Sequence, residues 1–232
     1  MNHLQPILTP RVVAQYVLLV IVVPLLPMLI SGRWDWWEAW VFAIICILGF
    51  VVSRALAERR HPGLLAERAR ILQQEDAKPW DKALVPLVGL GLILIPLVAG
   101  LDARFGWTPP FGLPLIILGL VVFLAADTFG LYALVENRFF SGMVRPQMER
   151  GQRVVSSGPY RWVRHPGYAG TLWANLAIPL LLASAWALVP AVLLAILLIV
   201  RTRLEDQTLQ EELPGYVDYA GQVRYRLFPG IW

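Results

Sequence analysis

Long apolar runs constrain this chain more than any other feature of its sequence. A helix that crosses a membrane needs about 20 mostly apolar residues, and four segments have this length and composition. A further apolar block is too long for one helix and carries Ser184 and Ala185 near its middle, so we expect two short helices joined by a tight turn. The four segments are residues 12–30, 39–56, 83–101 and 113–134, and the block is residues 168–200.

The composition agrees with this interpretation. Of the 232 residues 57% are hydrophobic and 16% are charged, which is typical of a membrane protein rather than a soluble domain. We therefore predict an all-α, multi-pass transmembrane bundle of about six spans, the last two forming a short helical hairpin. We expect one domain, residues 1–232, with four spans in 1–137 and a ligand-binding core with a cytoplasmic tail in 138–232.

The basic residues are distributed unevenly between the two sides of such a bundle. With six spans, only two of the 20 lysines and arginines, Arg33 and Arg104, fall on one side of the membrane. All others fall on the opposite side. Positive charge marks the cytoplasmic side, so both termini and the central basic segment should be cytoplasmic. The net charge of +4 is then explained by contact with anionic membrane lipids, and not by nucleic-acid binding.

Residues that could bind a metal are few. The single Cys46 excludes an internal disulfide and a cysteine-based metal cluster, and His3, His61 and His165 are too scattered to predict a metal site. We therefore expect no metal cofactor.

A basic, turn-rich segment, residues 152–170, interrupts the apolar sequence with QRVVSSGPYRWVRHPGYAG. Its Gly-Pro and His-Pro-Gly steps predict turns, because proline fixes φ and glycine accepts backbone angles that other residues avoid. Pro166 is placed to begin a helix with His165 at its N-cap, and the free N–H groups of a helix start attract a carboxylate or phosphate. The side chains that can stack on or hydrogen-bond to a ligand are Tyr160, Arg161, Trp162, Arg164 and His165.

An alternative is that residues 152–170 form a basic loop at the lipid headgroups. That explains the arginines, but it does not explain two proline-centred turns around a histidine and two tyrosines, so we favour a ligand site. Arg201 and Glu205 lie four residues apart and share one helix face. They form either an ordinary surface ion pair or, because the chain returns here to the cytoplasmic side, a pair that brackets a zwitterionic ligand.

Three further segments have open interpretations. Asp127 is an ionisable residue inside a span, either functional by default or paired with a cytoplasmic arginine. Residues 62–72 have apolar positions at helical spacing, which predicts an amphipathic element on the membrane. The tail from Pro214 to Trp232 mixes aromatic and basic residues and is either an interfacial anchor or a lid over the site.

The C-terminal motifs resemble the isoprenylcysteine carboxyl methyltransferase family, multi-pass membrane enzymes that use S-adenosylmethionine. The resemblance covers roughly the last 90 residues. The matching residues are Gly158-Pro159-Tyr160, Arg164-His165-Pro166-x-Tyr168-x-Gly170, a helical hairpin, Arg201-x-x-x-Glu205, Leu209, Tyr216 and Tyr219.

The resemblance implies a role for each matching position. Glu205 would receive the amino group of the cofactor, and Arg201 would face the methyl acceptor as the catalytic and substrate-binding residue. Arg145 falls near a polar cofactor contact of eukaryotic members, and Asp206 stands where a second glutamate is usual, which keeps the charge. The other cofactor contacts would be Gln152, Arg153, Val154, Val155, Tyr160, His165, Pro166, Gly167 and Tyr168.

The implied activity is transfer of a methyl group from S-adenosylmethionine to a carboxylate of a prenylcysteine-like or other lipid-like acceptor, in a bacterial inner membrane. Two other enzyme classes stay open. The C-terminal sequence also resembles membrane sterol reductases, which use NADPH, and an amine acceptor would make the protein a phospholipid N-methyltransferase. A methylated amine must first lose a proton, for which His165, Glu205 or Asp127 would be the candidate base. A scaffold without catalysis is the remaining hypothesis.

Overall fold

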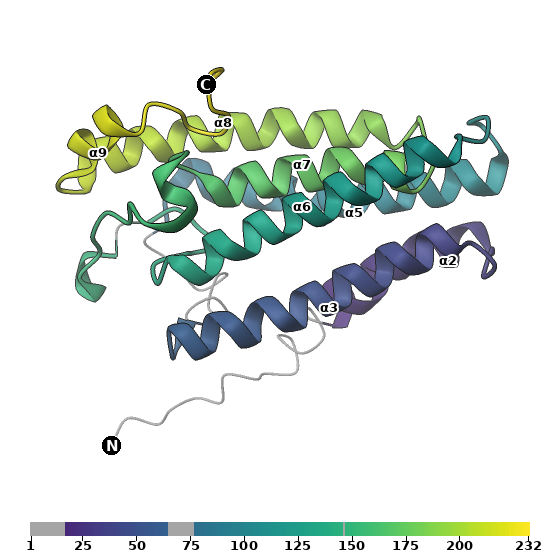
Figure 1. Ribbon diagram of the computed structural model, residues 1–232, viewed down its shortest axis with the longest axis horizontal. Coiled ribbons are helices and arrows are strands. Elements are labelled where there is room, and N and C mark those ends of the chain that lie inside the picture. Colours follow the sequence, from purple (N-terminus) through teal and green to yellow (C-terminus); the bar gives the residue numbers. More distant parts are fainter. Residues whose placement is uncertain (1–16, 65–76, 146) are drawn as a thin grey trace.

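The computed structural model describes residues 17–64, 77–145 and 147–232, and all regular secondary structure in this part of the chain is helical. Seven α-helices follow one another in this part of the chain, and the long ones run side by side in an elongated bundle (Figure 1). A π-helical turn, Leu18–Val22, precedes the first, and 3-10 turns at Met148–Arg150 and Gly158–Arg161 separate α6 from α7. The helices are α2 Val23–Ser31, α3 Trp37–Arg60, α5 Pro79–Phe105, α6 Leu113–Glu136, α7 Pro166–Leu181, α8 Leu188–Glu212 and α9 Tyr216–Gln222.

Among the described residues, three helices are long and apolar enough to cross a membrane, namely α3, α5 and α6. They confirm the predicted spans 39–56, 83–101 and 113–134, and with them an all-helical membrane protein. The first predicted span is described from residue 17 onward and contains the shorter apolar helix Leu18–Ser31; its residues 12–16 lie outside the described part. The total of six crossings stays a prediction.

The apolar block 168–200 forms two helices, α7 and α8, whose connection contains Ser184 and Ala185 as predicted. This turn is fixed to the end of α5 by Asp102, a buried carboxylate that accepts hydrogen bonds from the hydroxyl groups of Ser184 and Thr108. The N–H of Ala185 donates to Thr108 Oγ1 at 3.1 Å. The sequence pattern did not identify Asp102 as the residue that holds the turn.

Glycine lets α6 and α7 approach closely along their length. A Cβ atom on Gly119 of α6 would lie 2.5 Å from the backbone nitrogen of Leu181, and one on Gly170 of α7 would lie 2.7 Å from the carbonyl oxygen of Ala126. Such contacts are typical of membrane helices, where small residues allow backbones to pack together. Because Gly170 is in the second turn of α7, this packing fixes the helix start that carries the predicted site.

The described parts of the chain segments predicted to share the cytoplasmic side lie at one end of the bundle, together with α9 and both 3-10 turns (Figure 1). Ion pairs connect them, from Lys78 to Glu212, from Arg60 to Glu136 and from Arg164 to Asp206. Arg104 lies at the opposite end, where its Nη1 donates to the carbonyl of Ile30. The described parts of these segments therefore lie together, while the position of the N-terminus and the membrane side that each end faces stay predictions. The amphipathic element predicted at 62–72 falls mostly on residues 65–76, outside the described part.

Candidate functional site

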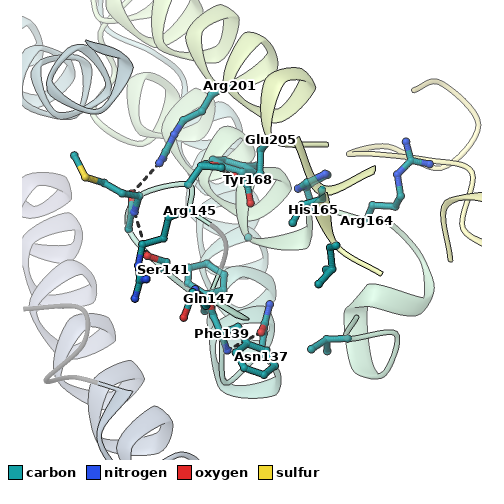
Figure 2. A pocket seen from close by; sticks show the side chains of 18 of the residues that line it. Asn137, Phe139, Ser141, Arg145, Gln147, Arg164, His165, Tyr168, Arg201 and Glu205 are labelled. Carbon is teal, nitrogen blue, oxygen red and sulfur yellow. Dashed lines mark hydrogen bonds between the residues drawn. The ribbon is translucent and has the colours of Figure 1, made fainter. Parts of the chain in front are cut away.

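A cavity of about 410 Å³ lies at the end of the bundle where the basic segments gather (Figure 2). Its wall comes from α5, α7, α8, α9 and the segment between α6 and α7, and it includes almost every residue that the sequence predicted for the site. Three predicted residues are not part of the wall: Pro166 is buried as the first residue of α7, and Arg161 and Trp162 are exposed outside the cavity. The predicted residues in the wall are Gln152, Arg153, Val154, Val155, Tyr160, His165, Gly167, Tyr168, Arg201 and Glu205.

The first turn of α7 faces this cavity as the sequence predicted. His165 is the N-cap by position, although its side chain makes no capping hydrogen bond. Gly167 and Tyr168 line the cavity, and their N–H groups have no acceptor one turn earlier because they belong to the first turn. Position 167 favours glycine, since a Cβ atom there would lie 2.7 Å from the ring of Phe140, which would have to shift. The wall therefore contains a helix start suited to a carboxylate.

Glu205 and Arg201 project from α8 into the same cavity, but they do not pair with each other as the simple interpretation of their spacing suggested. The carboxylate of Glu205 accepts a hydrogen bond from the hydroxyl of Tyr168. The guanidinium of Arg201 lies over the ring of Tyr168, 5.4 Å from its centroid. In Figure 2, Tyr168 and Glu205 lie between Arg201 and His165, so the cavity has an acidic group flanked by two basic side chains.

Arg201 forms its ion pair with Asp81, a residue that lies far away in the sequence. Its Nε and Nη2 contact the two carboxylate oxygens of Asp81 at 2.6 and 3.0 Å, and Nη2 also donates to the carbonyl of Gly142 at 2.8 Å. Asp81 is fully buried in the first turn of α5 and accepts a further hydrogen bond from the N–H of Val144 at 2.7 Å. No local sequence pattern predicts this partner.

Asp206, the residue after Glu205, is a second buried carboxylate, and its role is visible only in the structure. Its side chain is fully buried and forms a bidentate pair with Arg164, at 2.7 and 3.0 Å. His165 Nε2 lies 3.1 Å from it, and because an ionised carboxylate can only accept, this nitrogen carries the proton. The hydroxyl of Tyr216 also donates to it, at 3.0 Å, as does Nε of Arg226, at 2.8 Å.

The charge state of Asp206 follows from these partners. Burial by itself raises the pKa of the Asp206 carboxyl, but the hydrogen bonds from His165, Arg164 and Arg226 lower it by more, so its pKa lies below the ordinary value. The group is therefore ionised at neutral pH. Burial also raises the pKa of Tyr216 above its ordinary value, so this phenol keeps its proton and serves as a donor.

The C-terminal tail contributes side chains to the wall of the site, which is consistent with the interpretation of the tail as a cover. Tyr216 and Tyr219 of α9 line the cavity, and the hydroxyl of Tyr219 donates to the carbonyl of Tyr160 at 2.6 Å. The N–H groups of Arg164 and His165 donate to the carbonyls of residues 225 and 226, each at 2.9 Å. The tail thus holds the turn that precedes α7.

The segment between α6 and α7 forms the remaining wall and is braced internally. Gln147 is buried and its side-chain nitrogen donates to the carbonyl of Phe139 at 2.9 Å. The side chain of Gln152, a predicted site residue, accepts a hydrogen bond from the N–H of Gln147 at 2.7 Å. Gln152 therefore helps to fix the backbone of this wall. Asn137 donates to the hydroxyl of Tyr160 at 3.1 Å, so the end of α6 positions this tyrosine.

Of two further candidate residues, Arg145 lies in the cavity wall and Asp127 does not. Arg145 lines the cavity and pairs with Glu149 at 2.9 Å. Asp127 is not among the lining residues. It lies in α6 beside Gly49 of α3, where a Cβ atom would be 2.9 Å from its carboxylate. This placement gives no support to Asp127 as a base for an amine acceptor.

Comparison with known proteins points to the same part of the chain that forms the cavity. Residues 117–211 match the isoprenylcysteine carboxyl methyltransferase (ICMT) family. The protein YpbQ of Bacillus subtilis (strain 168) is 44% identical over 62 residues, which are 26% of this chain and 37% of YpbQ. The lamin-B receptor of Drosophila melanogaster is 29% identical over 133 residues, 54% of this chain and 18% of the receptor.

The matched regions thus cover well under half of the length of either relative, so these two proteins support the likeness of a region and not of a whole protein. The family match, by contrast, runs from α6 through α7 to the end of α8 and contains the first turn of α7, Arg201 and Glu205. Residues 117–211 of this chain, less than half of its length, thus match the isoprenylcysteine carboxyl methyltransferase family.

Proposed function

We propose that the protein is a membrane methyltransferase that uses S-adenosylmethionine to methylate a carboxylate on a prenylcysteine-like or other lipid-like acceptor. The family of residues 117–211 supports a methyltransferase. The observation that carries the proposal is the cavity of about 410 Å³, whose wall holds Glu205, the first turn of α7 and Arg201 together.

The lining residues fit the charges of S-adenosylmethionine. Its ammonium group needs an anion, and Glu205 is a carboxylate in the wall that already accepts a hydrogen bond. Its carboxylate needs donors, which the N–H groups of Gly167 and Tyr168 at the start of α7 supply. Aromatic rings in the wall, Tyr160 and Tyr168, suit the adenine or the sulfonium, through stacking or a cation–π contact.

The reaction needs orientation more than it needs a base. When bound, S-adenosylmethionine supplies an electrophilic methyl carbon: an acceptor oxygen forms the new C–O bond while the C–S bond breaks, its electron pair passes to sulfur, and a neutral thioether leaves. A carboxylate is ionised at neutral pH, so no proton has to move. The contribution of Arg201 is to orient that carboxylate, and positioning of this kind is a large part of rate enhancement.

The cavity also has an apolar part that suits a hydrocarbon chain. Four lining residues come from one face of α5, and Leu198 of α8 adds to the same lining. Along α5 the residues from the first to the last of these four span about 10 Å. Arg201 lies one turn from Leu198 on α8, so a chain in this part would bring its polar end towards Arg201. The four residues of α5 are Val85, Val88, Gly89 and Leu92.

Gly89 offers a test of this acceptor assignment. A Cβ atom there would meet nothing within 4 Å, so a larger side chain fits without a clash. Replacing the glycine should also not weaken the helix, since glycine inside a helix costs about 1 kcal/mol relative to alanine. Gly89→Leu should therefore fill the apolar part of the cavity and weaken binding of a farnesyl thioether by at least about tenfold, with S-adenosylhomocysteine affinity unchanged. Leu90→Phe, which adds bulk at a neighbouring exposed position, is the control. Equal farnesyl affinity in wild type and Gly89→Leu would contradict the acceptor assignment.

The charges in the wall favour S-adenosylmethionine over NADPH. A dinucleotide phosphate needs several cations that are free to bind its phosphates. Three of the arginines that line the cavity already have acidic partners: Arg164 and Arg201 are paired with buried aspartates, and Arg145 pairs with Glu149. An amine acceptor would need a base, and Asp127, one of the candidates for it, does not line the cavity.

Thermal-shift measurements on the purified full-length protein would test the proposed cofactor. We expect S-adenosylhomocysteine at 100 times its Kd to stabilise the protein by about 2.7 kcal/mol, and NADPH at the same concentration to have no effect. Stabilisation by NADPH alone would instead support the reductase alternative, and no shift with either ligand would support a scaffold. The proposal places the cavity and both termini on the cytoplasmic side of a bacterial inner membrane, following the distribution of basic residues.

A further inference from the structure

Asp81 lies outside residues 117–211, which match the family, yet it contacts the residue proposed to face the acceptor. Its side chain is fully buried and is not part of the cavity wall. Burying a carboxylate is unfavourable unless it is paired and hydrogen-bonded. Here both conditions are met, by the bidentate contact with Arg201 and by the N–H of Val144.

These contacts determine how Arg201 presents its donors. A guanidinium has five N–H groups in a fixed plane. Nε and one N–H of Nη2 point at Asp81, and the second N–H of Nη2 points at the carbonyl of Gly142. Nη1 makes no hydrogen bond to the described residues and so keeps two donors in a fixed orientation. Arg201 is part of the cavity wall, so the N–H groups of Nη1 are the ones that remain to bind a ligand in the cavity.

The same contacts determine the charge that a ligand encounters. The ion pair of Asp81 and Arg201 has no net charge, so an acceptor carboxylate meets directed N–H donors without an uncompensated cation. A full cation would bind the carboxylate more strongly but would also withdraw electron density from the attacking oxygen. Interactions that stabilise the ground state as much as the transition state do not raise kcat.

Asp81 also connects Arg201 to the wall opposite α8. Its carboxylate accepts a hydrogen bond from the N–H of Val144. The carbonyl of Val144 in turn accepts from the backbone N–H of Lys78 at 3.0 Å. Residues 141–145 line the cavity. A single buried carboxylate thus sets the position of the guanidinium and of the loop that faces it.

We propose that Asp81 is a positioning residue for methyl transfer: it fixes the orientation of Arg201 and compensates its charge, so that the acceptor carboxylate is held by directed donors and stays nucleophilic. This inference rests on the proposed function for its kinetic consequence. The statement that Asp81 holds Arg201 is independent of the reaction.

The test compares Asp81→Asn with Asp102→Asn in the full-length protein. Asp102 is the matched control, because it is a buried aspartate on the same helix that binds Ser184 and Thr108 at the opposite end of the bundle. With a farnesyl thioether acetic acid as the probe, Asp81→Asn should bind the acid about tenfold more tightly than wild type and leave the affinity for its methyl ester unchanged. Affinity for S-adenosylhomocysteine should not change in either variant.

Turnover gives the second readout. If the farnesyl acid is methylated, its KM should fall in Asp81→Asn while kcat falls by at least about tenfold, whereas loss of a purely structural contact would raise KM or lower stability alone. Parallel changes for acid and ester, or wild-type kinetics, would overturn the proposal. If Asp81→Asn does not fold, Asp81→Glu keeps the charge but displaces the guanidinium, and a kcat equal to that of wild type would overturn it.

Chemical modification separates this inference from the proposed function. The rate at which phenylglyoxal modifies Arg201, followed by mass spectrometry, should rise several-fold in Asp81→Asn, with Arg164 in the same protein as the internal reference. An unchanged rate would overturn the role of Asp81, whatever ligands the protein binds. If wild type binds no S-adenosylhomocysteine but the rate rises, the proposed function fails and the positioning of Arg201 by Asp81 stands.

Discussion

Glu205→Gln should weaken binding of S-adenosylhomocysteine by about tenfold to a hundredfold, because a hydrogen bond to a charged group contributes about 1.5–3 kcal/mol. Glutamine has nearly the same shape and can still accept from the hydroxyl of Tyr168, which in the wild type donates to the Glu205 carboxylate. The substitution therefore removes the negative charge and leaves the wall of the cavity in place. Isothermal titration on the purified protein would measure the change.

Glu211→Gln is the matched control for this prediction. Glu211 lies on the same helix, is exposed, and accepts a hydrogen bond from Gln207, so the control removes one acidic charge from α8 without touching the cavity. We expect it to bind like the wild type. If Glu205→Gln and Glu211→Gln bind S-adenosylhomocysteine equally well, Glu205 does not hold the ammonium group and the assignment of the site is wrong.

Asp206→Asn should lower the stability of the protein more than Glu205→Gln or Asp102→Asn. Removing one partner of a buried ion pair costs about 3–5 kcal/mol, because the remaining charge is left without compensation. Arg164 is itself buried, and His165 and Tyr216 also contact this carboxylate. The turn before α7 and helix α9 would both lose their shared partner, so Tm and S-adenosylhomocysteine affinity should fall together.

The pH dependence of this effect has a definite sign. The pKa of Asp206 is lower in the folded protein than its ordinary value of 3.8, so its contribution to stability is complete above that value and is lost as the pH falls below it. The difference in Tm between wild type and Asp206→Asn should therefore be constant near neutral pH and shrink in acid. Asp102→Asn, a buried aspartate at the other end of the bundle, should lower Tm without changing S-adenosylhomocysteine affinity at temperatures where it is folded.

The spans and the main lining residues were predictable from the sequence because they depend on local patterns. Apolar length predicts a helix in a membrane whatever its neighbours are, and α3, α5 and α6 confirm this. Pro166 begins α7 as expected, since proline fits the first position of a helix. The four-residue spacing of Arg201 and Glu205 places them on one face of α8, and both line the cavity.

The partners of these residues were not predictable, because they depend on contacts between distant segments. Asp81 lies 120 positions before Arg201, and Asp206 lies 42 positions after Arg164. In the sequence, Asp81 stands between a tryptophan and a lysine, and nothing in that local pattern indicates Arg201 as its partner. A signal was present for Asp206, since it directly follows Glu205 at a position where the family has a second acid.

The sequence alone determined that this chain is helical, that it lies in a membrane, and which side chains gather at the end of the bundle, because hydrophobic length, proline positions and helical spacing act over short distances. The tertiary structure decided which charge compensates which, and turned the C-terminal tail into a wall of the cavity. Ion pairing in a buried site depends on three-dimensional proximity, and packing of α5, α7 and α8 brings together carboxylates and guanidiniums that no local pattern connects.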